Sequence, residues 1–403
     1  MKVIFLTLVN VKEISSHSLY QDLLREFYKN VHDIYIVSPS TSGKTEVIHT
    51  EMAEILRVHT GTIQKTKNYI KKGIATVLLE PQYIFAIKKY FSNVQFDLIL
   101  YSTPPITLSG VASYIKKRDH AHTYLLLKDI WPQGVVDLGA LKKTGILGLA
   151  WRYFRYKERE LYKLSDYIGC MSQANVEYLH RHEPWINHSR IEVCPNSCEP
   201  VDQSVDQQTR NRLRKQYGLP LDKVIFVYGG NLGVPQGIDF FIECLKSAEQ
   251  LGDCFFLIVG DGTEFSKIEH YVQSESPSHI KLLRKLPKKE YDQLVGSCDV
   301  GMIYLNASLT VPNIPSRLLS YMEARIPVLA ATDHATDLKE IIRDGGFGWH
   351  SYAGDLDAFC QNMASACAAS SEERQAMGQR GWDYLLAHYT AAESYDIIMR
   401  HMV

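Results

Sequence analysis

The chain has 403 residues, which is enough for two domains that each bury a hydrophobic core. Hydrophobic residues make up 45% of it and charged residues 22%, as in ordinary soluble globular proteins, and the net charge of −1 argues against a strongly basic nucleic-acid-binding protein. No apolar run reaches the roughly 18 residues of a membrane span, and the apolar start at residues 3–9 is too short and wrongly flanked for a signal peptide. We therefore expect a cytoplasmic protein that binds no nucleic acid.

Apolar segments of strand length alternate with helical patterns along the whole chain, which predicts parallel, doubly wound sheets of the α/β class. In the first domain, residues 1–199, strands are expected near residues 2–9, 32–38, 54–59, 97–101, 121–127, 166–171 and 190–194. The helices between them include those near residues 17–30, 69–91, 106–118 and 147–163. A connection around residues 199–204 marks the domain boundary.

The second domain, residues 200–388, begins with a polar helix at residues 206–218. Its strands are expected near residues 223–229, 254–260, 279–283, 299–305, 326–330 and 346–350. Two closing helices follow, and the last of them, within residues 389–403, forms a separate C-terminal segment.

The eight cysteines are scattered, with no CxxC pair and no paired histidine spacing. Most fall in apolar strands or helices, which predicts free, reduced core thiols rather than metal ligands. They are Cys170, Cys194, Cys198, Cys244, Cys254, Cys298, Cys360 and Cys367.

Residues 310–331, TVPNIPSRLLSYMEARIPVLAA, place a cation, Arg317, in the first turn of a predicted helix. A cation is unfavourable at the positive end of a helix, whereas the unpaired N–H groups there suit an anion. This pattern predicts a phosphate bound by Ser316 and Arg317. Glu323 follows about 10 Å along the helix, on the face of Ser316, where it would reach ribose hydroxyls. The alternative is a buried helix with a surface arginine and a solvated or paired glutamate.

A glycine-rich loop within residues 223–237, KVIFVYGGNLGVPQG, joins an apolar strand to the next helix. Glycines let backbone N–H groups approach a phosphate closely, so Gly230, Asn231 and Gly233 are predicted to face it. A plain tight turn is the alternative, because such loops are common.

The pair YGGNLGVPQG and PNIPSRLLSYMEARIPVLAA resembles the C-terminal domain of glycosyltransferase family 4. Four further segments are similar to motifs of this family: CPNS at 194–197, FFLIVGDGTE at 255–264, DVGMIYL at 299–305 and KEIIRDGGFGW at 339–349. The resemblance implies the GT-B fold, in which two Rossmann-like doubly wound parallel-sheet domains face across a cleft and the last helix crosses back to the first domain.

Three positions depart from the common family pattern. Asn231 and Gln236 stand where many members carry an arginine and a lysine, and Pro315 stands where many carry a glutamate. With the KDIWP segment at residues 128–132, these departures resemble a subgroup of bacterial N-acetylfucosaminyl and related transferases of capsule and O-antigen assembly. Here Arg317 would supply the charge that the loop lacks, because an arginine fork can hold two phosphate oxygens.

The resemblance implies a retaining glycosyltransferase that moves a sugar from a nucleotide diphosphate, UDP above all, to a glycan acceptor that is lipid-linked. Charge stabilisation and positioning can drive this transfer, and no DxD motif follows a strand, so neither a metal nor a cofactor is expected. Leu286 and Pro287 would flank the base. The predicted donor-binding residues are Gly230, Asn231, Gly233, Gln236, Gly262, Leu286, Pro287, Pro315, Ser316, Arg317, Leu318 and Glu323.

Asp129 follows the predicted strand ending at Lys128, at the sheet edge where such folds bind ligands. Many family members have a histidine near this place, so Lys128 or Asp129 is its equivalent. Asp129 and Arg317 are the predicted catalytic residues. His17 could reach the same region, although a lone histidine before a helix is more often a cap or a surface residue.

Residues 69–91 and 146–167 combine basic with apolar and aromatic side chains, a composition that suits an anionic membrane surface. Ordinary helices that pack on the sheet with solvated lysines and arginines are the alternative. Two other functions stay open. A nucleotide-sugar epimerase of the same fold would need a cluster of carboxylates and histidine, which the sequence does not reveal. A non-catalytic nucleotide-sugar-binding protein would explain the missing loop cations.

Overall fold

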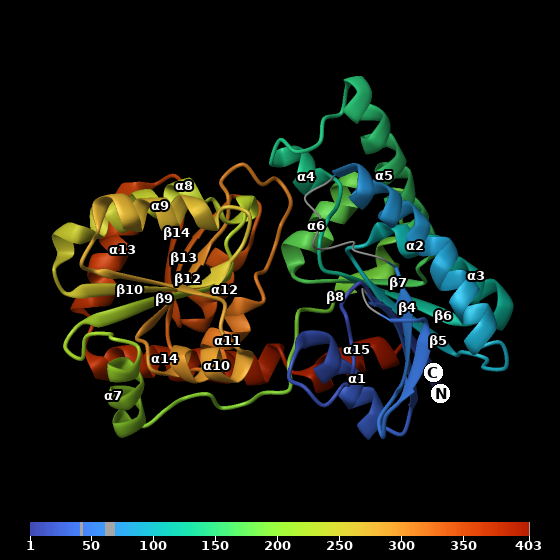
Figure 1. Ribbon diagram of the computed structural model, residues 1–403, viewed down its shortest axis with the longest axis horizontal. Helices are drawn as coiled ribbons and strands as arrows, with labels where there is room; N and C mark the ends of the chain where they lie inside the picture. The colour runs from blue at the N-terminus through green and yellow to red at the C-terminus, as the bar shows by residue number, and fades with distance from the viewer. Residues whose placement is uncertain (41–42, 61–68, 403) are drawn as a thin grey trace. The chain divides into compact units, whose positions relative to one another are not determined.

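The computed structural model describes residues 1–40, 43–60 and 69–402 (Figure 1). The chain forms two compact units, one of Met1–Glu199 with Ala391–Val403 and one of Pro200–Thr390. Each unit has a largely parallel sheet with helices around it, so the prediction of two parallel-sheet α/β domains is confirmed.

The first unit contains an eight-stranded sheet with the order β3-β4-β2-β1-β5-β6-β7-β8. All neighbouring strands are parallel except β3 and β4. Its central strands are buried along almost their whole length, as expected of parallel strands covered on both faces. The strands are β1 Lys2–Leu6, β2 Asp33–Ser40, β3 Glu46–His49, β4 Glu54–His59, β5 Leu98–Ser102, β6 His122–Leu127, β7 Tyr167–Cys170 and β8 Ile191–Val193.

Strand β3 is absent from the sequence-based prediction. It has four residues, Glu46–His49, and lies at the edge of the sheet with none of its side chains fully buried. An edge strand with so little burial needs no apolar run, and therefore leaves little signal in the sequence.

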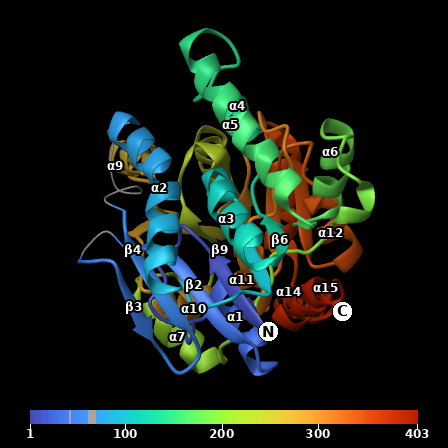
Figure 2. The same cartoon turned by 90° about the vertical axis from the view of Figure 1, so that its right-hand side faces the viewer.

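Seven α-helices among the described residues belong to the first unit: α1 Leu19–Lys29, α2 Tyr69–Tyr90, α3 Ser109–Asp119, α4 Gln133–Asp137, α5 Gly145–Leu164, α6 Gln173–His182 and α15 Ala391–Met399. The last helix, α15, packs on α1, where the rings of Phe27 and Tyr395 meet edge to face at 4.8 Å. The backbone N–H of Ala391 also bonds the carbonyl of Cys198 at 2.8 Å. These contacts place the end of the chain in the unit that contains its beginning (Figures 1 and 2).

The second unit contains a six-stranded, fully parallel sheet with the order β11-β10-β9-β12-β13-β14. The strands are β9 Val224–Asn231, β10 Cys254–Asp261, β11 Ile280–Arg284, β12 Val300–Tyr304, β13 Val328–Thr332 and β14 Gly348–Tyr352. The helices are α7 Gln207–Gln216, α8 Ile238–Ser247, α9 Phe265–Glu275, α10 Lys288–Gly296, α11 Arg317–Glu323, α12 Leu338–Gly345, α13 Leu356–Ala368 and α14 Ser371–His388.

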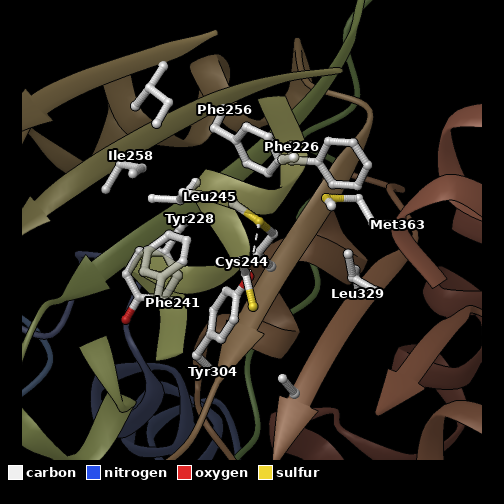
Figure 3. Packing of buried hydrophobic residues seen from close by; sticks show 14 of the residues in the cluster. Phe226, Tyr228, Phe241, Cys244, Leu245, Phe256, Ile258, Tyr304, Leu329 and Met363 are labelled. Atoms are coloured by element: carbon white, nitrogen blue, oxygen red, sulfur yellow. Dashed lines mark hydrogen bonds between the residues drawn. The ribbon is translucent and has the colours of Figure 1, made fainter. Parts of the chain in front are cut away.

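An aromatic core fills one face of this sheet. Phe241 of α8 stacks on Tyr304 of β12 at 4.4 Å, and Tyr228 of β9 lies 5.1 Å from Phe241 between ring centroids (Figure 3). The aromatic core therefore packs α8 against both β9 and β12.

That reversal falls between β9 and β12, because the chain proceeds outward from β9 to β11 and then returns to β12. The two strands pair at only two positions, after which the Tyr321 hydroxyl lies between them. It accepts the N–H of Gly229 at 3.3 Å and lies within 3.2 Å of the carbonyls of Val227 and Met302. The carboxyl ends of β9 and β12 thus part at the point where doubly wound sheets bind ligands.

Candidate active site

Arg317 is the first residue of α11, a short helix whose N-cap is Ser316. Pro315 precedes the cap and is half-buried, whereas Ser316 is exposed. Leu318 is fully buried. This buried side chain anchors the first turn and thereby sets where Arg317 can lie.

The guanidinium of Arg317 lies against the end of β9. Its Cζ atom is 4.2 Å from the centre of the Tyr228 ring, which is a cation–π contact. A Cβ atom built on Gly230 would lie 3.7 Å from Arg317 Nη2. The structure therefore brings together the glycine loop and the arginine that the sequence singled out separately.

One nitrogen of this guanidinium is buried and unpaired. Arg317 Nη1 has no hydrogen-bond partner within the described part of the chain, although the atom is shielded from solvent. Burial raises the pKa values of the adjoining Tyr228 and Tyr321 hydroxyls, so these groups stay neutral and leave the cation uncompensated. An anion at this place would supply both the missing charge and the missing acceptor.

The glycine loop is closed by its own side chains. Gln236 Oε1 accepts the N–H of Gly233 at 3.1 Å and a hydrogen from Asn231 Nδ2 at 3.0 Å. Asn231 and Gln236, the two loop positions that depart from the family pattern, therefore bond each other. Gly230 has φ +115, a conformation that L side chains rarely adopt, which explains a glycine at this position.

Three other predicted donor residues lie along the same edge of the sheet. A Cβ on Gly262 would come within 2.3 Å of the carbonyl oxygen of Leu232, so backbone packing alone requires a glycine there. Leu286 is half-buried, and the exposed Pro287 is the N-cap of α10. Both follow β11, which lies two strands from β9.

Glu323 lies in a different environment from Arg317. Its side chain is only 3% exposed, and Oε1 accepts the N–H of Val201 at 3.2 Å. Its carbonyl also accepts the N–H of Gln203 at 2.8 Å. The segment after Pro200 covers this end of α11, so Ser316 is exposed while Glu323 is buried. In this structure the carboxylate bonds the protein's own backbone, as the paired glutamate of the alternative interpretation would, and the ribose contact stays a prediction.

In the first unit, Lys128 and Asp129 follow β6, and their side chains point in different directions. Lys128 Nζ donates to the carbonyls of Cys194 and Pro195 at 3.3 and 3.0 Å, and burial lowers the pKa of this amine. Asp129 is exposed, and partial removal from water by the surrounding protein raises the pKa of its carboxyl to about 7. Of the two candidates left open by the sequence, Asp129 is thus the one with an accessible side chain.

Thr103 orients this turn, and its role was missed from the sequence. Its Oγ1 accepts the backbone N–H groups of both Lys128 and Asp129 at 3.1 Å. The signal that could have revealed it is its place directly after β5, since β5 is the neighbour of β6 in a parallel sheet. Polar residues after adjacent parallel strands meet at one edge.

His17 takes part in the start of α1. Its Nδ1 lies 2.7 Å from Asp22 Oδ2, and the other oxygen of Asp22 accepts the N–H of Ser18 at 2.9 Å. Arg25 bonds the same carboxylate. The histidine is therefore held in a helix-start network, as in the alternative interpretation of this residue.

Within the described ranges, no group of three histidine, cysteine, aspartate or glutamate side chains could hold a metal ion. All eight cysteines are free; six are buried, and Cys360 and Cys367 are half-buried. None of the helices in the described ranges has the length and apolarity needed to cross a membrane.

Two family domains cover most of the chain. Residues 18–200 match Glycosyltransferase Family 4, and residues 209–383 match Glycosyl transferases group 1. The probable glycosyltransferase WbjE of Pseudomonas aeruginosa is 20% identical over 361 residues, covering 89% of this chain and 87% of that protein. The putative colanic acid biosynthesis glycosyl transferase WcaI of Escherichia coli (strain K12) is 28% identical over 353 residues, covering 81% and 80%.

Solved structures share the fold at low sequence identity. Sucrose-phosphate synthase from Thermosynechococcus elongatus is 16% identical with a TM-score of 0.77, covering 100% of this chain and 98% of that chain. HepE of Anabaena in complex with UDP and glucose is 14% identical with a TM-score of 0.69, covering 100% and 99%. From the two domain matches, the two parallel-sheet units and these similarities it follows that the chain is a glycosyltransferase of the GT-B type.

Proposed function

We propose that this enzyme moves a sugar from a nucleotide diphosphate, most specifically UDP, to a glycan acceptor, with retention of anomeric configuration. The observation that carries the proposal is the buried, unpaired Nη1 of Arg317 beside Gly230, where the strand order of the second unit reverses. The solved HepE complexes contain UDP or UDP-glucose, which supports the choice of base.

In this proposal the second unit binds the donor, and Arg317 holds the diphosphate. As the bond between the anomeric carbon and the β-phosphate oxygen breaks, the acceptor oxygen bonds that carbon from the same face, and negative charge grows on the departing UDP. The guanidinium fork and the N–H groups around Gly230 would stabilise that charge, and UDP itself would take the proton of the acceptor hydroxyl. Asp129 in the first unit would accept a hydrogen bond from the acceptor.

The pathway is the finer part of the proposal. WcaI is named for colanic acid biosynthesis, which supports a role in bacterial polysaccharide assembly. We propose in addition a hexosyltransferase with a lipid-linked acceptor. The proposed subgroup remains that of the N-acetylfucosaminyl and capsule or O-antigen transferases, and the proposed place of action is the cytoplasmic side of the membrane.

Thermal unfolding with UDP, GDP, ADP and dTDP, each with EDTA or magnesium, tests the donor site. We expect UDP to raise the melting temperature without a metal. Arg317→Ala should weaken UDP binding roughly ten- to a hundredfold, the loss expected for charged hydrogen bonds, and should weaken uridine binding much less. The matched control is Arg284→Ala, since Arg284 lies at the same sheet edge but already pairs with Glu269 and Asp261. Equal losses for UDP and uridine would contradict the diphosphate contact.

One observation favours the non-catalytic alternative. Asn231 and Gln236 bond each other, so the loop offers no cation of its own to a leaving diphosphate. Release of UDP from UDP-sugars by the purified protein, lost in Arg317→Ala, would exclude a simple binding protein. UDP binding without any turnover of donor and glycan acceptors would favour it.

A further inference from the structure

The N-terminal part of α5 presents an apolar stripe that none of the described residues of its own unit covers. Ile146 is 88% exposed, Leu149 66% and Tyr156 58%, and Tyr153 is exposed as well. These four positions follow one another at intervals of three or four residues, so they lie on one face of the helix. The stripe is about 15 Å long from the rise per residue.

The opposite face of the same helix is firmly packed. Gly148, Glu158, Leu161 and Tyr162 are buried, and the ring of Phe154 meets that of Trp131 at 4.4 Å. A Cβ on Gly148 would come within 2.7 Å of the carbonyl of Lys143, so the helix start rests directly on the preceding turn. The exposed stripe is therefore carried on a supported helix, whose end stands clear of the rest of its unit in both views (Figures 1 and 2).

The charge around the stripe has one sign. Residues 138–157 contain five lysines and arginines and no acidic residue, although the whole chain has a net charge of −1. Arg155 pairs with Glu158 and Glu183, and Lys157 pairs with Glu80. The remaining three, Lys142, Lys143 and Arg152, have no carboxylate partner among the side chains that the structure describes.

We propose that this stripe docks the enzyme on an anionic lipid bilayer. Ile146, Leu147 and Leu149 would enter the boundary of the acyl chains, and Tyr153 and Tyr156 would lie at the depth of the headgroups. The three cations without a described carboxylate partner, of which Lys143 lies 5.9 Å from the centre of the Trp151 ring, would contact lipid phosphates. A second copy of this chain is a poorer occupant, because it would bring the same cations against one another.

This inference does not depend on sugar transfer. The inference rests on α5 alone; of the other basic segment, residues 69–91, the side chains of residues 69–77 lie outside the described residues.

Co-sedimentation of the full chain with lipid vesicles tests the proposal. We expect binding to vesicles of phosphatidylcholine mixed with phosphatidylglycerol, much weaker binding to pure phosphatidylcholine, and weakening by salt. Ile146→Ser combined with Leu149→Ser should reduce binding by about tenfold or more, because two exposed apolar side chains are lost from the contact. Lys142→Glu combined with Lys143→Glu should reduce it by more than tenfold on anionic vesicles.

The matched control is Val31→Ser, since Val31 is 89% exposed in the same unit but belongs to the turn after α1. It should bind vesicles as the unchanged chain does. Circular dichroism and thermal unfolding of each variant without lipid check that the first unit is folded.

Three outcomes would overturn the proposal. These are no binding of the unchanged chain to anionic vesicles, equal binding by the Ile146→Ser, Leu149→Ser variant, or equal loss in the Val31→Ser control. A dimer in sedimentation experiments that this double variant separates, without vesicle binding, would assign the stripe to self-association instead.

Discussion

At the scale of single residues, the folded protein holds Arg317 and Asp129 in environments that are less favourable for their charged groups than water is. Arg317 buries a donor that has no acceptor among the described residues, which is costly unless a ligand supplies one. Asp129 has a raised carboxyl pKa. Groups perturbed in this way are concentrated at functional sites, where binding or chemistry compensates for the lost stability.

The Asp129 carboxyl should make stability depend on pH. Its pKa is about 7 in the folded chain, against 3.8 as the ordinary value, so the folded state holds the proton over a range where the unfolded state has lost it. This contribution to stability is complete below about pH 4 and is lost as the pH rises through about 7. Asp129→Asn should therefore melt at a higher temperature than the unchanged chain above neutral pH, and at a similar temperature in acid.

Thermal unfolding across this pH range, followed by circular dichroism, measures the effect. A difference between the two proteins that stays constant from acid to alkaline pH would show that the carboxyl has an ordinary pKa. Loss of acceptor turnover in the more stable Asp129→Asn protein would link the strain at this residue to function.

At the scale of elements, Tyr321 shapes the crevice between β9 and β12. Its hydroxyl occupies the gap where the strands stop pairing, and Gly301 leaves room for its ring, because a Cβ there would lie 2.3 Å from Tyr321 Cγ. One side chain from α11 thus replaces ladder hydrogen bonds between two strands. The same helix carries Arg317, so the opening of the sheet and the placement of the cation are linked.

Tyr321→Phe should therefore affect both stability and donor binding. Removing the hydroxyl leaves the Gly229 N–H without its acceptor, which should lower the free energy of unfolding by about 1–3 kcal/mol. UDP affinity should fall with it. Urea denaturation and UDP titration measure the two effects. The control is Tyr271→Phe, in the same unit on α9, which should change neither the unfolding free energy nor the UDP affinity by a comparable amount. An unchanged UDP affinity in Tyr321→Phe would show that the Tyr321 hydroxyl does not shape the donor site.

At the scale of the whole molecule, the first unit is completed by the last helix of the chain. Ile398 of α15 is fully buried in the core cluster that contains Phe5 and Phe27. Residues at both ends of the sequence therefore stabilise one sheet. The second unit lies between them in the sequence and has a core of its own.

Ile398→Ala should consequently destabilise the first unit while leaving the donor site intact. We expect a loss of about 2–5 kcal/mol in unfolding free energy, with UDP affinity unchanged. The matched variant is Ile342→Ala, a buried isoleucine of α12 in the second unit. Calorimetry with and without UDP distinguishes them, because UDP should raise only the transition of the unit that binds it. If UDP raised the unfolding transition affected by Ile398→Ala as much as the one affected by Ile342→Ala, the assignment of UDP binding to the second unit alone would be contradicted.

The amino-acid sequence by itself determined the alternation of strands and helices, the glycine loop and the cation at the start of α11. Each of these depends on local chemistry: side-chain periodicity, the φ that Gly230 adopts, and the unpaired N–H groups of a helix start. Tertiary structure alone decided which side chains face outward. Lys128 turns inward because the carbonyls of Cys194 and Pro195, just after β8, accept its hydrogens, and Glu323 is buried because the segment after Pro200 covers it. Both partners are distant in sequence or follow no periodic pattern, so neither contact could be predicted from residue spacing. The exposure of the α5 stripe has the same origin, since the composition of residues 146–167 was compatible with a packed helix as well.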